Sequence, residues 1–316
     1  MMIINLIRKP IKLFVNLSIK IFEKIFIKVL KIFSMRIVFQ RENRIGHQIE
    51  NFESDLYESI QLKERKIKTI FIFYETHNLV ANIYARELIF KVLNNHNINY
   101  FICRNIFLSK IIKIFLNYYK DDFYLKKSKA TEKKLTYPLF DGLLNNLIVK
   151  DLGLKEKKYV CIYNRESQYL AEKYPVIDFS YHNHRDANIN NLKELSNYIR
   201  SNYGFSVVRV GSNTLKKISW EQKDHPLIFD YSKSDLRSDE NDINLISQCN
   251  LYINNGGGPF SIANAAKTEV ITINQIPIFE PPQSKIWLPK LIRYLDTKKY
   301  LTINEMVKLN IHTRLN

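Results

Sequence analysis

Apolar strand-like segments alternate with amphipathic helix-like segments along this chain, and the alternation constrains the fold more than any other feature. In the first half, strands are expected at residues 35–39, 68–74 and 98–103, with helical stretches ending near Leu62 and spanning 79–93. Strands separated by helices predict a parallel sheet that is covered by helices on both faces. The sequence therefore predicts an α/β fold.

The same alternation starts again in the second half of the chain. Strands are expected at 159–163, 205–210, 227–230, 251–254 and 270–273, and helices at 189–201, 242–249 and 260–266. A lysine-rich connection at 120–134 and a polar stretch at 151–158 place the domain boundary between about 135 and 157. Because 316 residues suit two domains of roughly 150 residues, we expect two Rossmann-like domains, 36–150 and 151–316, that face a cleft.

Residues 1–35 form a basic amphipathic segment ahead of the first strand. Lysines interrupt its apolar residues at close intervals, at Lys9, Lys12, Lys20, Lys24, Lys28 and Lys31. The longest uncharged apolar run, 13–19, is shorter than the roughly 18 residues of a membrane-spanning helix, and no signal-peptide core is intact. We expect a helix that lies on the membrane surface, where each basic residue adds about 1 kcal/mol of attraction to anionic lipid. An amphipathic helix packed on the protein's own core is the alternative.

Net charge and cysteine content limit the possible binding partners and the cellular compartment. The formal charge of +17 suits nucleic acid, phosphorylated ligands or acidic lipid, but it also suits the codon usage of an AT-rich genome, so charge alone selects no function. The three cysteines, Cys103, Cys161 and Cys249, show no Cys-x-x-Cys spacing, which favours a reducing compartment over a disulfide framework or a zinc ribbon. We expect a cytoplasmic protein, peripheral at the inner face of the membrane.

Three consecutive glycines, Gly256, Gly257 and Gly258, stand between an expected strand and an expected helix in a chain with only eight glycines. Glycine lets the backbone approach a ligand, and the N–H groups at a helix start favour an anion. We therefore expect a phosphate seat there, with Ser261 in the first helical turn. A tight turn without a ligand is the alternative. The pattern is neither Gly-x-Gly-x-x-Gly nor a Walker loop, so hydride transfer and NTP hydrolysis lose their usual support.

Three arginines are expected on loops at the same edge of the second sheet as the glycine turn. Arg165 follows the first strand of the domain, Arg185 precedes a helix, and Arg209 ends the next strand, close to Gly211. Ligands of doubly wound sheets bind at the carboxyl ends of the strands, and guanidinium groups pair bidentately with phosphate oxygens. The three arginines together with Gly211 therefore predict a diphosphate site, although any one of them alone is more often a surface or salt-bridging residue.

Acidic residues near this edge are assigned supporting roles. Asp186 follows Arg185, and Asp239 and Asp242 precede the helix that leads to the glycine strand, where at least one of them is expected to cap the helix. Asp-x-Asp, a common motif for binding divalent metals, occurs nowhere in the chain. We expect no metal site and no cofactor.

A candidate general base lies in the first domain. His47 ends the turn Arg44-Ile-Gly-His, and its reference pKa of about 6.5 suits proton transfer near neutral pH. A helix-capping or core histidine is the alternative, and Glu50 and Asp55 are weaker candidates for the base.

Several segments together resemble a family of predicted bacterial glycosyltransferases from surface-polysaccharide gene clusters. They are RIGH and the acidic helix after it (44–58), NRESQYL (164–170), HRDANI (184–189), GFSVVRVG (204–211), FDYSKS (229–234), DINLISQCNLYINNGGGP (242–259) and NQIP (274–277). The donor domain of GT-B fucosyltransferases is more distantly similar, but Tyr163 stands where those enzymes carry the His of His-x-Arg. The resemblance implies a GT-B-like fold, a nucleotide-sugar donor in the carboxy-terminal domain and an acceptor toward the amino-terminal domain.

The resemblance and the candidate residues predict a metal-independent glycosyltransferase that transfers a hexosyl group to a surface-polysaccharide or lipid-linked glycan. The arginines and the glycine turn would hold the donor diphosphate, and His47 or a nearby carboxylate would deprotonate the acceptor. One alternative is a nucleic-acid-binding protein or nuclease that uses the basic surface and His182 with His184. Another is a non-catalytic membrane-associated scaffold. The sequence defines neither nucleotide nor sugar, acceptor nor linkage.

Overall fold

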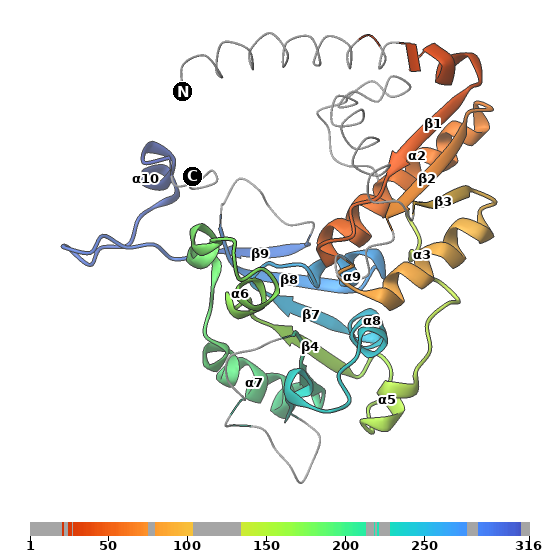
Figure 1. Cartoon of the computed structure of the whole chain (residues 1–316). Coiled ribbons are helices and arrows are strands. Elements are labelled where there is room, and N and C mark those ends of the chain that lie inside the picture. Colours follow the sequence, from red (N-terminus) through yellow and green to blue (C-terminus); the bar gives the residue numbers. More distant parts are fainter. Residues whose placement is uncertain are drawn as a thin grey trace. The chain divides into compact units, whose positions relative to one another are not determined.

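The computed structural model describes residues 21, 25–26, 28–74, 80–103, 134–212, 218, 220, 228–276 and 284–310 (Figure 1). The chain separates into two compact units, and the main division falls between Leu135 and Thr136. Two short segments that precede this division, Arg44–Glu50 and Asn82–Leu88, belong to the second unit. Each unit is built around its own parallel sheet.

The first unit contains a three-stranded sheet in the order β1-β2-β3. Its strands are β1 (Met35–Phe39), β2 (Lys68–Tyr74) and β3 (Asn99–Cys103). Its helices include α2 (Phe52–Glu64) and the part of α3 (Ile83–Asn95) from Ile89 onward. Phe52 of α2 packs edge-on against Phe71 of β2, with ring centroids 5.6 Å apart, and both rings are fully buried. Aromatic burial of this kind holds the helix on the sheet.

The second unit contains a six-stranded parallel sheet in the order β6-β5-β4-β7-β8-β9. The strands are β4 (Tyr159–Tyr163), β5 (Ser206–Arg209), β6 (Ile228–Phe229), β7 (Leu251–Asn254), β8 (Glu269–Gln275) and β9 (Ile286–Pro289). Counted from β4, the order is 3-2-1-4-5-6, that of a doubly wound sheet. The order reverses between β4 and β7, which are hydrogen-bonded neighbours with Tyr163 opposite Asn254.

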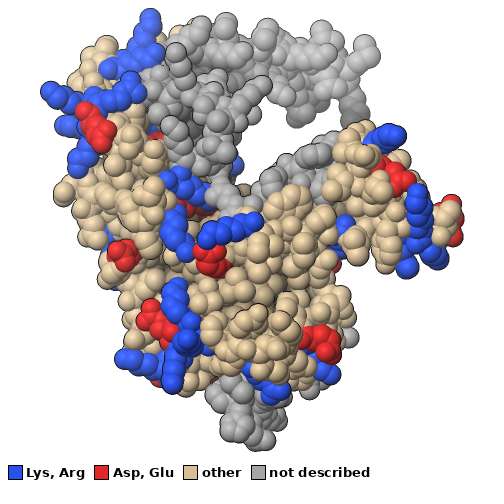
Figure 2. Space-filling view, turned by 180° about the vertical axis from the view of Figure 1, so that it is seen from behind, with Lys and Arg blue, Asp and Glu red and all other residues tan. Residues whose placement is uncertain are grey.

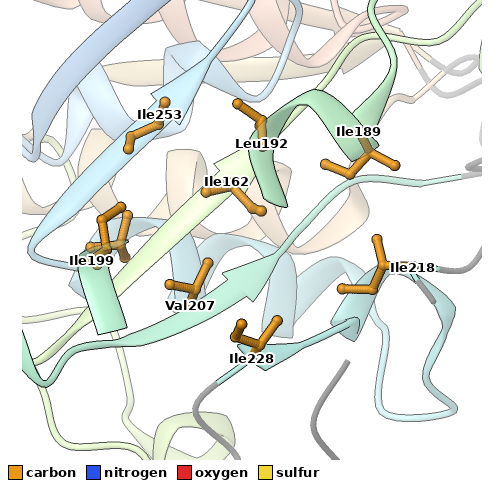
Figure 3. Close-up of a cluster of buried hydrophobic side chains, with 9 residues drawn as sticks. Ile162, Ile189, Leu192, Ile199, Val207, Ile218, Ile228 and Ile253 are labelled. Atoms are coloured by element: carbon orange, nitrogen blue, oxygen red, sulfur yellow. The ribbon is translucent and has the colours of Figure 1, made fainter. Parts of the chain in front are cut away.

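Helices cover both faces of this sheet. The helices of this unit are α5 (Leu147–Asp151), α6 (Gln168–Lys173), η3 (Ser180–Arg185), η4 (Ile189–Leu192), α7 (Lys193–Tyr203), η5 (Tyr231–Lys233), α8 (Asp239–Gln248) and α9 (Phe260–Ala265). A further helix, α10 (Ile303–Lys308), packs in a small cluster of its own with Leu301. On one face, Ile162 and Val207 of the sheet meet Leu192 of η4 and Ile199 of α7 (Figure 3). On the other, the Tyr159 hydroxyl donates to the carbonyl of Leu245 in α8 (2.7 Å). The central strands are therefore buried on both sides, as in other parallel sheets.

The structure confirms the α/β class and the parallel sheets. Strands β1, β2, β4 and β7 have the predicted bounds. Helix α8 starts at Asp239 instead of Asp242, because Ser238 is its cap and accepts a hydrogen bond from the Asn241 N–H (3.1 Å). The capping role expected of Asp239 or Asp242 was therefore wrong for this helix. Strand β9 and helices α5, α6 and α10 were not predicted.

The predicted membrane helix lies mostly outside the described residues, since residues 1–20 are not among them. None of the helices in the described part of the chain has the length and apolarity needed to cross a bilayer. Cys103, Cys161 and Cys249 are buried free thiols, and the reducing compartment stays a prediction. The cleft between two domains stays a prediction.

Candidate functional site

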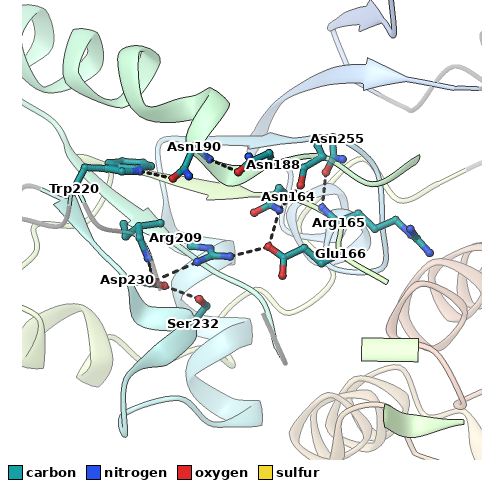
Figure 4. A network of polar contacts seen from close by, with 12 residues as sticks. Asn164, Arg165, Glu166, Asn188, Asn190, Arg209, Trp220, Asp230, Ser232 and Asn255 are labelled. Atoms are coloured by element: carbon teal, nitrogen blue, oxygen red, sulfur yellow. Dashed lines mark hydrogen bonds and ion pairs between the residues drawn. The ribbon is translucent and has the colours of Figure 1, made fainter. Parts of the chain in front are cut away.

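The segments that follow β4 and β7 are tied together at the point where the strand order reverses. Asn255, directly after β7, accepts a hydrogen bond from the backbone N–H of Arg165 through Oδ1 (2.6 Å). Its Nδ2 donates to the carbonyl of Arg185 (2.9 Å). Figure 4 shows Asn255 beside the start of the loop that carries Arg165. One buried amide therefore fixes the backbone at both arginines. Ligands of doubly wound sheets bind at this reversal.

Arg165 and Arg185 supply positive charge where the strand order reverses. We call these two arginines and the glycine turn 256–258 the arginine site. Arg165 is only 6% exposed, and its Nη1 pairs with the carboxylate of Asp186. An Arg185 nitrogen, Nη2, lies 3.2 Å from the point where a Cβ on Gly256 would be. Burial lowers the pKa of Arg165, and the neighbouring charges of Arg185 and Arg44 lower it further. Like charges held together in a partly buried place favour the binding of an anion.

Lys290 supports the loop that carries Arg185, and sequence reasoning missed it. Its Nζ donates to the carbonyl of His184 (2.6 Å) and to that of Asp186 (3.1 Å). Lys290 directly follows β9, the edge strand that the sequence did not predict, and partial burial lowers its pKa. Lys290 therefore stabilises the backbone on both sides of Arg185, although it is more than a hundred residues away in the sequence.

At each glycine of the turn, a neighbouring group of the chain leaves little room for a side chain. Gly256 and Gly257 have φ of 84° and 132°. A Cβ on Gly257 would lie 2.9 Å from the Tyr163 ring, and one on Gly258 would lie 2.3 Å from Cγ2 of Ile45. Positive φ and close approach both require glycine. The turn therefore serves packing around the arginine site, in addition to any ligand.

The predicted first-domain turn packs against these glycines within the second unit. The carbonyl of Ile45 accepts a hydrogen bond from Ser261 Oγ (3.3 Å), which also donates to the Gly258 carbonyl (2.8 Å). Ser261 thus binds backbone of the chain itself. His47 is half-buried at the start of a single π turn, η1 (His47–Asn51), a feature common at functional sites.

Arg209 is not on the surface that Arg165 and Arg185 form. Its side chain is fully buried; Nη2 pairs with Glu166 Oε1 (3.0 Å) and Nη1 with Asp230 Oδ2 (3.3 Å). Asp230 also accepts hydrogen bonds from Ser232 Oγ and the N–H of Ile218. Figure 4 shows the Arg165 guanidinium extending away from this buried network. The full burial of Arg209 between two carboxylates does not fit the ligand contact that the sequence predicted.

The remaining predicted residues take structural positions. Gly211 is buried, with φ of 128°, two residues beyond β5. Asp239 accepts a hydrogen bond from the N–H of Ile83 through Oδ2 (2.8 Å), which caps helix α3. Asp242 pairs with Arg237 (3.0 Å), and burial raises its pKa to about 6. Neither aspartate contacts Arg165 or Arg185 through the hydrogen bonds and ion pairs found in the described part of the chain. Of these three predicted aspartates, Asp186 is the one that pairs with an arginine of the site.

The alternative metal pair is not supported by the described residues. The His182 side chain lies outside them, and they contain no group of three or more His, Cys, Asp or Glu arranged to hold a metal ion. On the face that Figure 2 shows, Asp and Glu lie among the Lys and Arg residues.

No family model and no curated protein match the chain. Among solved structures, the ADP-heptose LPS heptosyltransferase II of E. coli matches 82% of this chain and 91% of its own, at 13% identity and a TM-score of 0.41. E. coli heptosyltransferase WaaC with ADP-2-deoxy-2-fluoro heptose matches 87% and 99%, at 10% identity and 0.42. The glycosyl transferase family 9 protein of Veillonella parvula matches 87% and 95%, at 12% identity and 0.40. These identities and TM-scores are too low to assign an activity to this chain. The residues of the site are the basis for a functional proposal.

Proposed function

We propose that the chain is a glycosyltransferase whose second unit binds the nucleotide diphosphate of a sugar donor. The observation that carries the proposal is the convergence of Arg165 and Arg185 at the reversal of strand order, next to the glycine turn. Guanidinium groups in a partly buried place bind phosphate oxygens through charge-assisted, bidentate hydrogen bonds. The resemblance of the motifs in this chain to bacterial polysaccharide glycosyltransferases agrees with this chemistry.

The proposed reaction is the direct transfer of a hexosyl group to a hydroxyl of a surface-polysaccharide or lipid-linked glycan. When the bond between sugar and diphosphate breaks, negative charge grows on the leaving phosphate, and Arg165 and Arg185 stabilise it. His47 accepts the proton of the attacking hydroxyl. The two arginines replace a divalent cation as the source of positive charge, so transfer is proposed to be metal-independent.

A thermal-shift panel tests donor recognition. Full-length protein is heated with UDP, GDP, ADP, CMP or a short single-stranded oligonucleotide, each with and without EDTA. We expect one nucleoside diphosphate to stabilise the fold by about 2.7 kcal/mol at a concentration near 100 times its dissociation constant. That gain corresponds to a rise of several degrees in melting temperature, and EDTA should not change it.

The outcomes of the panel separate the function classes. Stabilisation by the oligonucleotide alone would favour the nucleic-acid-binding alternative, and the absence of any response would favour a scaffold. A response that disappears with EDTA would contradict metal independence while leaving nucleotide binding intact.

We further propose that the amino-terminal segment attaches the enzyme to the inner face of the cytoplasmic membrane, where a lipid-linked acceptor would be found. Ile21, Ile25, Val29 and Ile32 follow each other at intervals of four, four and three residues, and all four side chains are exposed. This spacing places them on one helical face, and the exposed Lys28 accompanies them. Apolar side chains beside basic ones suit the interface of an anionic bilayer.

Co-sedimentation with vesicles tests this attachment. The full chain should bind vesicles that contain anionic phosphatidylglycerol and bind pure phosphatidylcholine weakly. Ile25→Asp with Ile32→Asp should weaken binding by roughly tenfold or more, because each loses the burial of an aliphatic side chain. Val176→Asp is the control, since Val176 is 94% exposed at a separate site. Equal loss in both variants, or unchanged binding of the double variant, would contradict the proposal.

A further inference from the structure

We propose that Arg44 is the third guanidinium of the arginine site and that the site thereby selects a diphosphate over a monophosphate. The inference rests on the proposed function, since it concerns the same ligand. It assigns a donor-binding role to a residue that precedes the second sheet by more than a hundred positions in the sequence. It also replaces Arg209, whose guanidinium is fully buried between Glu166 and Asp230.

The backbone of Arg44 is held against the glycine turn by its neighbours. Ile45 Cγ2 and the backbone nitrogen of Gly46 lie 2.3 Å and 3.6 Å from the position of a Cβ on Gly258. Ser261 Oγ donates to the Ile45 carbonyl (3.3 Å), and the N–H of Gln48 donates to the carbonyl of Arg44 (2.9 Å). The backbone next to Arg44 is therefore held against Gly258. The Arg185 side chain approaches Gly256, which is two residues earlier in the same turn.

The side chain of Arg44 extends toward the segment that ends at Arg185. Its guanidinium carbon lies 5.3 Å from the centre of the Phe179 ring. Phe179 directly precedes η3, and Arg185 is the last residue of that short helix. Stacking on an aromatic face orients a guanidinium without neutralising its charge. Among the described residues, no carboxylate forms a salt bridge with Arg44.

The charges of this group match a diphosphate. Three guanidinium groups, those of Arg44, Arg165 and Arg185, contribute to this group, and the carboxylate of Asp186 pairs with Arg165. The charges of Arg44 and Arg165 also act on one another. A sugar nucleotide with a diphosphate carries a negative charge on each phosphate, whereas one with a monophosphate carries a single charge. A site with a third guanidinium therefore favours the diphosphate.

Titration calorimetry on full-length protein tests the inference, with the nucleoside diphosphate that gives the largest thermal shift and the monophosphate of the same base as probes. Arg44→Ala should weaken diphosphate binding by about 10-fold to 100-fold and monophosphate binding much less. Arg44→Lys keeps the charge but not the planar stacking and should weaken it roughly twofold to fivefold. Arg41→Ala removes an exposed charge three residues away and should change binding less than about twofold.

A second pair of variants moves Arg44 without altering any guanidinium. Gly258→Ala places a Cβ on Cγ2 of Ile45 and should displace the turn, which weakens diphosphate binding. Ile45→Ala removes that methyl group, so the double variant should recover part of the loss. This pair gives an answer even if Arg44→Ala folds poorly.

Comparing the Arg44→Ala and Arg165→Ala variants separates the role of Arg44 from nucleotide binding as such. If Arg44→Ala binds the diphosphate within about twofold of wild type while Arg165→Ala loses it, Arg44 lies outside the site and the inference is wrong. Equal weakening of monophosphate and diphosphate binding would overturn the selectivity. If Arg165→Ala also binds normally, the proposed function itself fails.

Discussion

Replacing Arg165 and Arg185 together with alanine should weaken nucleoside diphosphate binding more than about 100-fold and abolish sugar transfer. Each hydrogen bond from a charged group contributes about 1.5–3 kcal/mol, so the loss of two guanidinium groups exceeds about 3 kcal/mol. Binding is measured by titration calorimetry, and transfer by release of the nucleoside diphosphate. The fold should persist, because Asn255 holds both segments through the backbone N–H of Arg165 and the carbonyl of Arg185.

A charge-matched control separates a specific site from general attraction. Lys155→Ala with Lys298→Ala also removes two positive charges, and both lysines are exposed. This control should bind the nucleotide within about twofold of wild type, since exposed charges contribute little. An equal loss in both double variants would mean that the net charge of the chain, and no particular site, attracts the nucleotide.

Replacing Arg209 with methionine should destabilise the fold by about 3–5 kcal/mol, because the substitution leaves the buried Asp230 carboxylate without its counter-charge. Chemical denaturation followed by circular dichroism measures the change. Adding Asp230→Asn should restore part of the stability, since the buried negative charge is then removed as well. As a control, Lys285→Ala breaks the exposed pair with Glu269 and should cost at most about 1 kcal/mol.

The same variants decide what Arg209 does. If Arg209→Met keeps wild-type stability and loses nucleotide binding, Arg209 contacts the ligand as the sequence suggested, and the structural role is wrong. If stability falls and the folded fraction still binds the nucleotide, Arg209 has the structural role that its two carboxylate partners indicate.

Much of the architecture could be predicted because its signals are local. The buried strands β4 and β7 are short and mostly apolar, an asparagine follows each of them, and their bounds were predicted without error. The glycine turn and the place of Arg165 follow from these two strands. The reversal of strand order between them could not be predicted from any one segment, since it depends on the pairing of all six strands.

The misjudged residues depend on partners that are distant in the sequence. Asp239 was expected to cap α8, yet it is the first residue of that helix, and its carboxylate accepts the N–H of Ile83 at the start of α3, 156 positions away in the chain. Arg209 looks like a loop residue at a strand end, but two carboxylates meet it in the core. Lys290 follows a four-residue edge strand that ends in proline, a pattern too short for periodicity to reveal.

The most direct test of the central claim is a calorimetric titration of the full-length protein with nucleoside diphosphates, carried out beside the Arg165→Ala, Arg185→Ala double variant. The account predicts saturable binding of at least one nucleoside diphosphate at one site per chain, and no measurable binding to the folded double variant. Binding of equal affinity in both proteins, or no binding of any nucleotide to the folded wild-type protein, would contradict it.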